Sequence, residues 1–334
     1  MDIKILTATQ TMERALAFTF IRLVFYLALS IALLIATFMG LGFGLIGGGA
    51  VDTISPHDSS GGIIGFVLCG VAIYSTRGLW FYFVKARHIA LLVDVVAEKM
   101  IPEGSAQNDY ARQRVTKRFA SARELFSLHQ MIKRIRIYLI KTCTSVGSQL
   151  PAIANPFAAK IVGAVVAAPL NFLDEIMIAY SFKDDSKGPW SAASEGVVFF
   201  AQNFRLMWRN AWILFFLMYA GLFGVYLLML VPVAWVEEII PVPIGNWRYV
   251  FALVFAWPVK AALFEPVALA GLILLLFQHS EGKQLNPDWV DRLHNSSAEY
   301  NEIQNNANVE IAGDTEAAAK SDVDASDQEE AGSS

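Results

Sequence analysis

Four long apolar runs alternate with polar segments along this chain. They cover Leu23–Ile46, Gly62–Val84, Ala211–Val236 and Tyr249–Gln278. At about 1.5 Å per residue, a helix over each run is long enough to cross a hydrocarbon core of about 30 Å. The pattern therefore predicts an all-α integral membrane protein with four firm transmembrane helices. The last run is longer than one crossing needs, so we expect it to tilt or to kink at a proline.

Basic residues are concentrated in one of the polar segments. Residues 85–141 hold twelve Lys and Arg against five Asp and Glu, whereas the loops at 47–61 and 237–247 hold acids and no Lys or Arg. Loops rich in Lys and Arg remain on the cytoplasmic side of a membrane. We therefore expect a multi-pass protein of the cytoplasmic (inner) membrane with both termini in the cytoplasm.

Residues 142–182 interrupt this simple order. The segment is apolar on average, but prolines, Lys160 and the pair Asp174 and Glu175 break it. A single crossing here would place the following basic loop outside, so the charge pattern favours a re-entrant or double-pass hairpin that returns to the cytoplasm. Irregular backbone at membrane depth needs protein or water to satisfy its polar groups, so such a hairpin would pack inside the bundle. Two helices lying flat on the cytoplasmic interface are the alternative.

The basic segment has the pattern of two amphipathic helices separated by a turn at residues 102–108. Apolar residues recur at spacings of three and four in each half. They are Ile89, Leu92, Val93, Val96 and Met100 in the first half, and Val115, Phe119, Ala122 and Phe126 in the second. Such a pair can bind anionic lipid headgroups or dock on the bundle, and a plain topogenic loop with ordinary helix packing is the alternative. The segment lacks aromatic interleaving, so we expect no nucleic-acid partner.

The composition changes beyond Leu293. Residues 296–334 contain ten acids and one base, Lys320, among Ala, Asn and Ser. Such a segment buries too little apolar surface to offset its ordering entropy, so it is predicted to be disordered. Truncation after Asn295 is then expected to leave membrane insertion and thermal stability near those of the wild type. An electrostatic latch against the basic helices and a plain solubilising tail are the two interpretations of this segment.

These patterns divide the chain into five segments. They are a cytoplasmic amphipathic N-terminal segment (1–22), the first two transmembrane helices (23–84), the basic helical pair (85–141), a hairpin, amphipathic helix and last two transmembrane helices (142–293), and the disordered acidic tail (294–334). The composition fits a chain largely in lipid, because 55% of the residues are hydrophobic, 17% are charged and the mean hydropathy is +0.45. The two cysteines, Cys69 and Cys143, are too few for a disulfide framework.

Charged residues within the apolar runs are the strongest candidates for a site. Lys260 and Glu265 lie in the last run, where a charge costs roughly 2.5 to 3.5 kcal/mol on insertion scales. They are five residues apart, or about 140° around a regular helix, so they meet only if Pro266 distorts the turn between them. Together with Asp174 and Glu175 they form either a solute path or a set of buried structural ion pairs, in which Lys260 pairs with one of these two acids.

The remaining motifs indicate packing rather than chemistry. Gly40, Gly44 and Gly48 repeat every four residues in the first run, which predicts a helix-packing face. No strand precedes these glycines and no phosphate-loop Lys follows them, so they do not form a nucleotide-binding loop. The five histidines have no metal-ligand spacing, and no catalytic motif is present. We therefore expect no catalytic residue, no metal and no cofactor in a protein that is not an enzyme.

The order of features from Phe172 onward carries a family resemblance. The string Asp174–Phe182 (DEIMIAYSF) is followed by an amphipathic segment over Ser191–Asn210, two spans and a polar exit at Gln278–Gly282. This C-terminal third resembles the C-terminal half of the choline-transporter-like membrane family. The resemblance implies the order hairpin, amphipathic helix and two spans, together with a transport function. It assigns no individual site residue.

Two functions of different classes follow from these patterns. One is solute transport, or an accessory role in it, around the four charged residues named above. The other is a non-enzymatic membrane scaffold that recruits partners through its basic helices and acidic tail. Membrane lipids are expected contacts in both, and the second adds protein partners or a second copy of the chain. Whether Lys260 and Glu265 face a cavity or a packed helix interface distinguishes the two.

Overall fold

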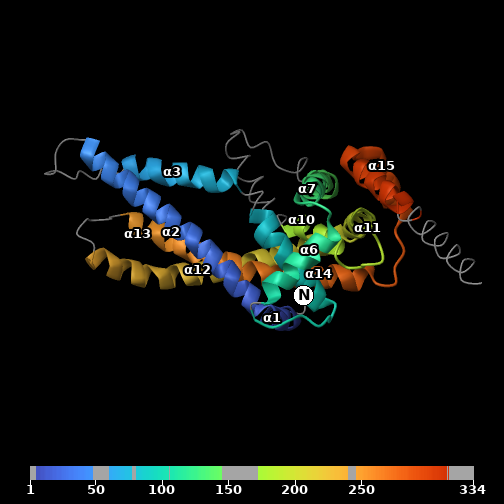
Figure 1. Cartoon of the computed structure of the whole chain (residues 1–334), viewed down its shortest axis with the longest axis horizontal. Coiled ribbons are helices and arrows are strands. Elements are labelled where there is room, and N and C mark those ends of the chain that lie inside the picture. The colour runs from blue at the N-terminus through green and yellow to red at the C-terminus, as the bar shows by residue number, and fades with distance from the viewer. Residues whose placement is uncertain are drawn as a thin grey trace, which may run out of the picture.

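The computed structural model describes residues 5–47, 60–76, 80–104, 106–144, 172–239, 246–313 and 315. Within these ranges every regular element is a helix, in agreement with the predicted all-α class (Figure 1). In chain order the elements are α1 (Ile5–Arg14), α2 (Leu16–Gly47), α3 (Ser60–Ser75), the π-helix η1 (Phe81–Ala86), α5 (Arg87–Val96), α6 (Ala106–Arg118), α7 (Ala122–Thr144), α10 (Leu173–Tyr180), α11 (Pro189–Gln202), α12 (Phe204–Ile239), α13 (Trp247–Val259), the π-helix η3 (Lys260–Phe264), α14 (Glu265–Ser280) and α15 (Pro287–Ser296). Residues 298–313 form a further helix.

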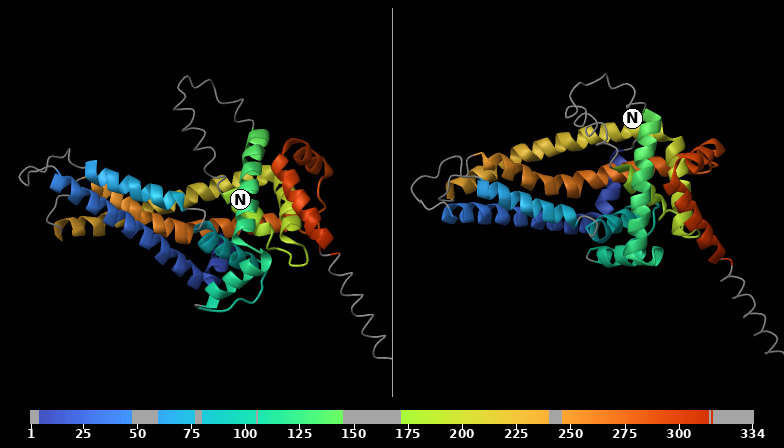
Figure 2. Two further views of the ribbon diagram at one scale, coloured as in Figure 1. Left: turned by 45° about the horizontal axis from the view of Figure 1, so that its top comes forward. Right: turned by 90° about the horizontal axis from the view of Figure 1, so that it is seen from above.

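The helices form an elongated arm and a compact base. α2, α3, α12 and α13 run lengthwise toward one end of the molecule (Figure 1, Figure 2), where α2 packs along α3 and α12 packs along α13. We call these four helices the arm. The base is made of the elements gathered at the other end, namely α1, α5, α6, α7, α10, α11, α14, α15 and the helix 298–313.

Among the described residues, three stretches are long and apolar enough to cross a membrane: Leu16–Gly40, Phe204–Val236 and Trp247–Ser280. They correspond to the first, third and fourth predicted spans, and each begins earlier than predicted. Of the second predicted span, Gly62–Val84, the structure describes α3, which ends at Ser75, and η1, while residues 77–79 lie outside the described residues. At about 1.5 Å per residue, α3 falls short of a hydrocarbon core of roughly 30 Å. The structure therefore gives three candidate spans and a shorter apolar helix rather than four firm spans.

Large exposed apolar side chains cover the arm. Leu68, Leu228 and Trp235, for example, are 65%, 69% and 68% exposed. A continuous apolar surface of this kind is favourable against lipid and costly against water. On the last apolar run the large exposed side chains end at Leu263, and most of α14 is buried in the base. The exposed apolar surface of this run therefore ends near the junction between arm and base.

α2 and α3 approach each other so closely that the contact requires glycine. A Cβ atom at Gly40 would overlap the carbonyl oxygen of Gly61, and a Cβ atom at Gly65 would overlap that of Ala36. Gly40 of the predicted packing face therefore lies where a second helix approaches. Gly44 lies in a part of α2 whose side-chain surroundings are not described, and position 48 lies outside the described residues.

The basic segment forms three helices rather than the predicted two. α5 carries the predicted stripe from Ile89 to Val96 and is almost wholly buried, but Met100 of that stripe lies beyond the end of α5 and is 97% exposed. The second stripe is divided, because α6 ends at Arg118 and a capping box starts α7: Ser121 Oγ accepts from the Glu124 N–H at 3.2 Å. Of the predicted stripe, Phe126 is 43% exposed. The buried stripe of α7 consists instead of Leu125, Leu128, Ile132, Ile135 and Leu139.

Part of the acidic tail is folded, contrary to the prediction of disorder. Residues 298–313 are helical, and Ser297 caps this helix by accepting from the Tyr300 N–H at 3.2 Å. Tyr300 and Ile303 are 1% and 0% exposed, because they pack into the core of the base. The predicted disorder is therefore wrong for this helix, and its buried residues argue against the predicted dispensability. Residues 316–334 lie outside the described residues.

Most of the predicted hairpin at 142–182 lies outside the described residues. Its last part is α10, which packs against α5, α7, α11 and α14 in the base. The charged pair of the hairpin, Asp174 and Glu175, is therefore buried in the base.

Both ends of the described chain lie at the base. α1, which belongs to the predicted N-terminal segment 1–22, packs against α14 and α5. At the other end, the hydroxyl of Ser194 in α11 lies 3.4 Å from that of Tyr300 in the C-terminal helix. α2 already begins at Leu16, so Arg22 is a residue of the arm rather than of a separate terminal segment.

Candidate functional site

Buried ion pairs join the arm to the base. Lys260 Nζ lies 2.8 Å from Glu265 Oε1, and Arg22 Nη2 lies 3.0 Å from Glu265 Oε2. The side chains of Arg22 and Lys260 are 2% and 5% exposed, and that of Glu265 is 14% exposed. One carboxylate thus pairs with two buried cations, so each cation has an opposite charge beside it although the three side chains together carry a net positive charge. We name these three residues the junction network.

A π-helical turn brings Lys260 and Glu265 together. In η3 the Glu265 N–H donates to the carbonyl oxygen of Lys260, five residues earlier, so the two side chains project to one side. Pro266 has no N–H, so the carbonyl oxygen of Ala262 lacks its usual helical donor and the backbone can widen here. The distortion at Pro266, on which the meeting of the two charges was expected to depend, is present.

Aromatic rings surround the cations of the junction network. Lys260 Nζ lies 4.4 Å from the ring centroid of Trp257 and 5.0 Å from that of Tyr219. The Arg22 guanidinium lies 5.5 Å from the ring centroid of Tyr26. Rings at such distances attract cations through their negative faces and exclude water at the same time.

Arg22 also makes a contact with the base through His88 of α5. Arg22 Nη1 donates to His88 Nδ1 at 2.9 Å, and His88 is 0% exposed. Burial is the main cause that holds the pKa of His88 well below its ordinary value, and the charge of Arg22 lowers this pKa further. His88 is therefore neutral and can accept the hydrogen bond from the guanidinium.

Asp174 and Glu175 do not pair with Lys260, so this part of the structural ion-pair hypothesis is wrong. Glu175 Oε1 lies 2.7 Å from Lys85 Nζ, and Asp174 pairs with residues of α7. Lys260 has a nearer carboxylate in Glu265, which the π-helical turn supplies. Of the four predicted site residues, Lys260 and Glu265 thus pair with each other, whereas Asp174 and Glu175 each pair with other residues. Sequence reasoning missed Arg22, because it placed the first span from residue 23 onward.

The ion pairs of Asp174 connect α10 to α7. Its carboxylate oxygens lie 3.1 Å from His129 Nε2 and 3.3 Å from Arg136 Nη1. Burial tends to raise the pKa of Asp174, but the hydrogen bond with His129 and the charge of Arg136 outweigh burial. This pKa therefore lies below its ordinary value of 3.8. A carboxyl whose folded pKa is depressed stabilises the folded state above its unfolded pKa and loses that effect as the pH falls through its folded pKa.

Asp174→Asn is expected to lower the thermal unfolding temperature at neutral pH and to lose this effect in acid. The difference from the wild type should shrink as the pH falls below about 3.8, because the wild-type carboxyl then becomes protonated as well. This difference in unfolding temperature is measured by circular dichroism melts of the detergent-solubilised proteins at a series of pH values. Asp109→Asn, at an exposed residue, is the control and should follow the wild type throughout. A deficit of Asp174→Asn that is constant with pH would contradict the prediction.

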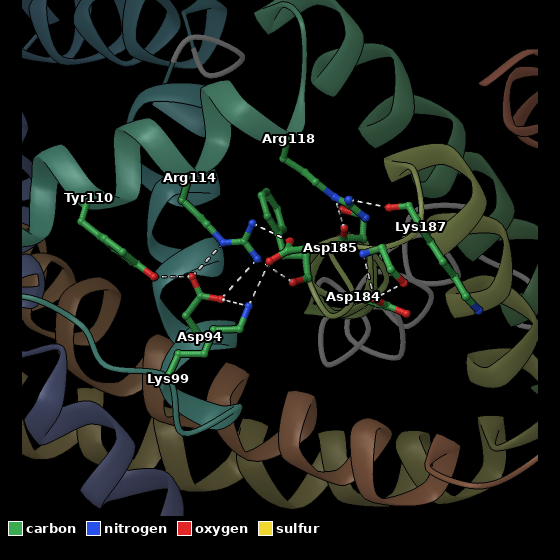
Figure 3. Close-up of polar contacts among 11 residues, drawn as sticks. Asp94, Lys99, Tyr110, Arg114, Arg118, Asp184, Asp185 and Lys187 are labelled. Atoms are coloured by element: carbon green, nitrogen blue, oxygen red, sulfur yellow. Dashed lines mark hydrogen bonds and ion pairs between the residues drawn. The ribbon is translucent and has the colours of Figure 1, made fainter. Parts of the chain in front are cut away.

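A second ion cluster, which sequence reasoning missed, reaches from the buried Asp94 to the surface of the base (Figure 3). Asp94 is 0% exposed and accepts from Arg114 Nε at 2.8 Å and from the Tyr110 hydroxyl at 3.0 Å. Lys99 Nζ lies 3.1 Å from Asp94, and Arg114 Nη1 lies 2.6 Å from Asp185. Burial, followed by the charge of Asp94, raises the pKa of Tyr110 to about 12, so its hydroxyl remains a donor. The signal in the sequence was an acid within the otherwise apolar stripe of α5.

The same face of α6 holds the loop between α10 and α11. Arg118 Nε donates to the carbonyl oxygen of Ser181 at 2.6 Å, and Arg118 Nη1 donates to that of Lys187 at 2.5 Å (Figure 3). Arg114 Nη2 donates to the carbonyl oxygen of Phe182 at 3.1 Å. These basic residues of α6 therefore stabilise the base from within and are not available to an external partner.

The junction network is packed inside protein. Cavities of about 340 to 660 Å³ open between the described helices, and neither Lys260 nor Glu265 lines them. Within the described ranges, no group of three or more His, Cys, Asp or Glu could hold a metal ion. Each cation of the network has the Glu265 carboxylate as partner, so its geometry is that of a structural contact rather than an open binding site.

What the chain does has to be inferred from its own arrangement of arm, junction network and base. No family model matches this chain, and neither a curated protein nor a solved structure matches it. The resemblance of the C-terminal third to the choline-transporter-like family therefore stays a prediction.

Proposed function

We propose that this protein is a non-enzymatic membrane scaffold, in which the arm anchors the base at the surface of the cytoplasmic membrane. One observation carries the proposal: Glu265 pairs with both Arg22 and Lys260 within packed helices, and all three side chains are largely buried. A solute path would need polar groups in a wet cavity. Here the charges are used to attach the arm to the base.

Further contacts support a rigid connection between arm and base. Arg22 of the arm bonds to His88 of α5, while Glu265 begins α14, which is buried in the base. Close by, Lys85 of η1 pairs with Glu175 of α10 at 2.7 Å. A base held in a fixed orientation at the membrane is what a recruiting surface needs, because a preorganised surface loses less entropy on binding.

The charge pattern determines the proposed orientation and partner type. Lys and Arg are concentrated in the base, so the base and both termini are proposed to lie in the cytoplasm. Arg112, Lys117 and Arg123 of α6 and α7 are exposed. These side chains favour an anionic partner, either a protein surface or lipid headgroups.

Solute transport, or an accessory role in it, is the second candidate, and one observation favours it. The last apolar run is interrupted by η3 next to Pro266, and transporters bind solutes where membrane helices are broken. In this chain the two charged residues at the break, Lys260 and Glu265, pair with each other, and Lys260 also lies over the ring of Trp257. The two candidates therefore differ in whether water reaches this break.

Cysteine accessibility distinguishes the two candidates. In a background with Cys69→Ser and Cys143→Ser, Ala262→Cys introduces a thiol beside the network at a position that is 0% exposed. For a scaffold, this thiol should resist a charged thiol reagent for many minutes in membrane vesicles open to both sides. Lys117→Cys, at an exposed position of α6, should react rapidly and is the positive control.

Minutes of exposure are long compared with the microseconds to seconds in which large conformational transitions of proteins occur, so a path that opens transiently would also be detected. Labelling of Ala262→Cys at a rate close to that of Lys117→Cys, in protein that retains its melting temperature, would contradict the scaffold and support the transport candidate.

A further inference from the structure

A cavity of about 660 Å³ lies in the corner between the arm and the base. Its apolar wall includes Phe25 and Leu29 of α2 and Ile73 of α3. Its polar wall includes Lys85 and, on α7, Lys133. The cavity is therefore apolar on one side and basic on the other, which fits an anionic amphiphile.

The apolar side continues along the arm. A neighbouring cavity of about 340 Å³ shares Tyr26, Leu29 and Ile73 with the first and extends to Leu253 and Trp257 of α13. A ligand in the corner cavity can thus lay an apolar chain along the lipid-facing side of α2. A small hydrophilic anion would leave this apolar extension unused.

The basic side combines a fixed and an uncommitted ammonium group. Lys85 is held 2.7 Å from Glu175 but remains 30% exposed, and an ammonium has further donors for a ligand. Lys133 is partly buried and makes no hydrogen bond or ion pair with the residues that the structure describes. Glu175 and Asp174, the carboxylates next to this wall, do not line the cavity, so a ligand meets the cations first.

α7 lies where it would meet the membrane surface. In both further views it runs across the long axis of the arm (Figure 2). Phe126 and Ile137, which are 43% and 45% exposed, share the face of Lys133 at spacings of seven and four residues. Trp80 stands in the same corner, with its ring 4.8 Å from that of Phe25. An amphipathic helix with apolar residues around a lysine, next to a tryptophan, is typical of the headgroup region.

We propose that the corner cavity binds a phosphate-bearing anionic lipid from the leaflet next to the base. The phosphate oxygens accept hydrogen bonds from Lys85 and Lys133, because lysine ammonium groups bind phosphate as point charges. One acyl chain lies along Leu29 and Ile73 toward Trp257. Inorganic phosphate offers the same headgroup chemistry without the chain. This inference shares Lys85 and the placement of the base beside the membrane with the scaffold proposal, but its test uses Lys133 and Gly70, so the two proposals can fail separately.

The test compares soluble lipids on the purified full-length protein in nonionic detergent, with binding measured by native mass spectrometry. Short-chain phosphatidylglycerol should bind roughly tenfold more tightly than the phosphatidylcholine of the same chain length, since one charge-assisted bond accounts for about that factor. Lys133→Gln should remove most of this preference. Lys117→Gln, an equal loss of charge at an exposed site away from the cavity, should retain it.

A steric variant tests the cavity itself. Gly70 lines the cavity, and a Cβ atom added there meets nothing within 4 Å. Gly70→Leu should therefore fold normally, fill part of the cavity and weaken phosphatidylglycerol binding about tenfold or more. Gly224→Leu is the matched control, because a Cβ atom at this arm residue also meets nothing and the residue lies outside the cavity wall.

Three results would overturn the proposal. Equal affinity for the two lipids would show that the basic wall does not select a headgroup. Displacement of the lipid by inorganic phosphate at an equal concentration would show a free-anion site instead. Wild-type binding by Gly70→Leu, with an unchanged melting temperature, would place the lipid elsewhere.

Discussion

Glu265→Gln is expected to destabilise the folded protein by about 3–5 kcal/mol, the range found when one partner of a buried ion pair is removed. Arg22 and Lys260 are 2% and 5% exposed, and Glu265 is the carboxylate that compensates both. Without it, two cations remain buried within hydrogen-bond distance of a neutral amide. The loss should appear as a large fall in the thermal unfolding temperature in detergent.

The companion variants make this prediction specific. Lys260→Met should cost less than Glu265→Gln, because Glu265 retains Arg22 as partner. The double variant Lys260→Met with Glu265→Gln should recover part of the loss of Glu265→Gln alone, since only one uncompensated cation then remains. Glu302→Gln, at an exposed residue of the C-terminal helix, is the control for removal of a carboxylate. If Glu265→Gln melts like the wild type, the network is solvated and the scaffold argument loses its main support.

The sequence identified Lys260 and Glu265 but not their geometry. A charged side chain within an apolar run costs free energy whether the run lies in lipid or in a protein core, so the two residues could be recognised from the sequence pattern alone. Their pairing depends on the extra residue of the π-helical turn, which regular helical periodicity does not contain. The second partner, Arg22, is 243 residues away along the chain, and no local pattern connects it with Glu265.

The boundaries of the arm helices were likewise only partly predictable from the sequence. Apolar runs predicted the first, third and last long stretches, because burial in lipid and burial in protein both select apolar residues. That ambiguity also applies to the second predicted span, which is not confirmed as a crossing: its last part, η1, leads directly into α5, which is buried in the base. The same ambiguity explains α14: its apolar sequence predicts a transmembrane segment, but other helices cover it in the base.

The acidic tail misled the sequence reasoning through its average composition. Ten acids in the segment indicated disorder, but a stripe of Tyr300, Ile303 and Ala307 at spacings of three and four passes through them. The acids near the start of the helix are favourable there, because the helix dipole attracts negative charge to its N-terminus. The three apolar residues of this stripe are all buried, so their packing was sufficient to fold the helix despite the acidic composition of the segment.

Ile303→Ala is accordingly expected to destabilise the base by about 2–5 kcal/mol, the usual cost of removing a fully buried Ile side chain. Ile303 is 0% exposed in the core of the base, whereas Val309 in the same helix is 72% exposed. Val309→Ala should therefore change the unfolding temperature little and is the control for helix propensity and chain position. Thermal melts of both variants, together with limited proteolysis of the C-terminal helix, measure the effect. Equal melting of the two variants would mean that the helix does not pack on the base, and that the acidic segment is dispensable from residue 298 onward.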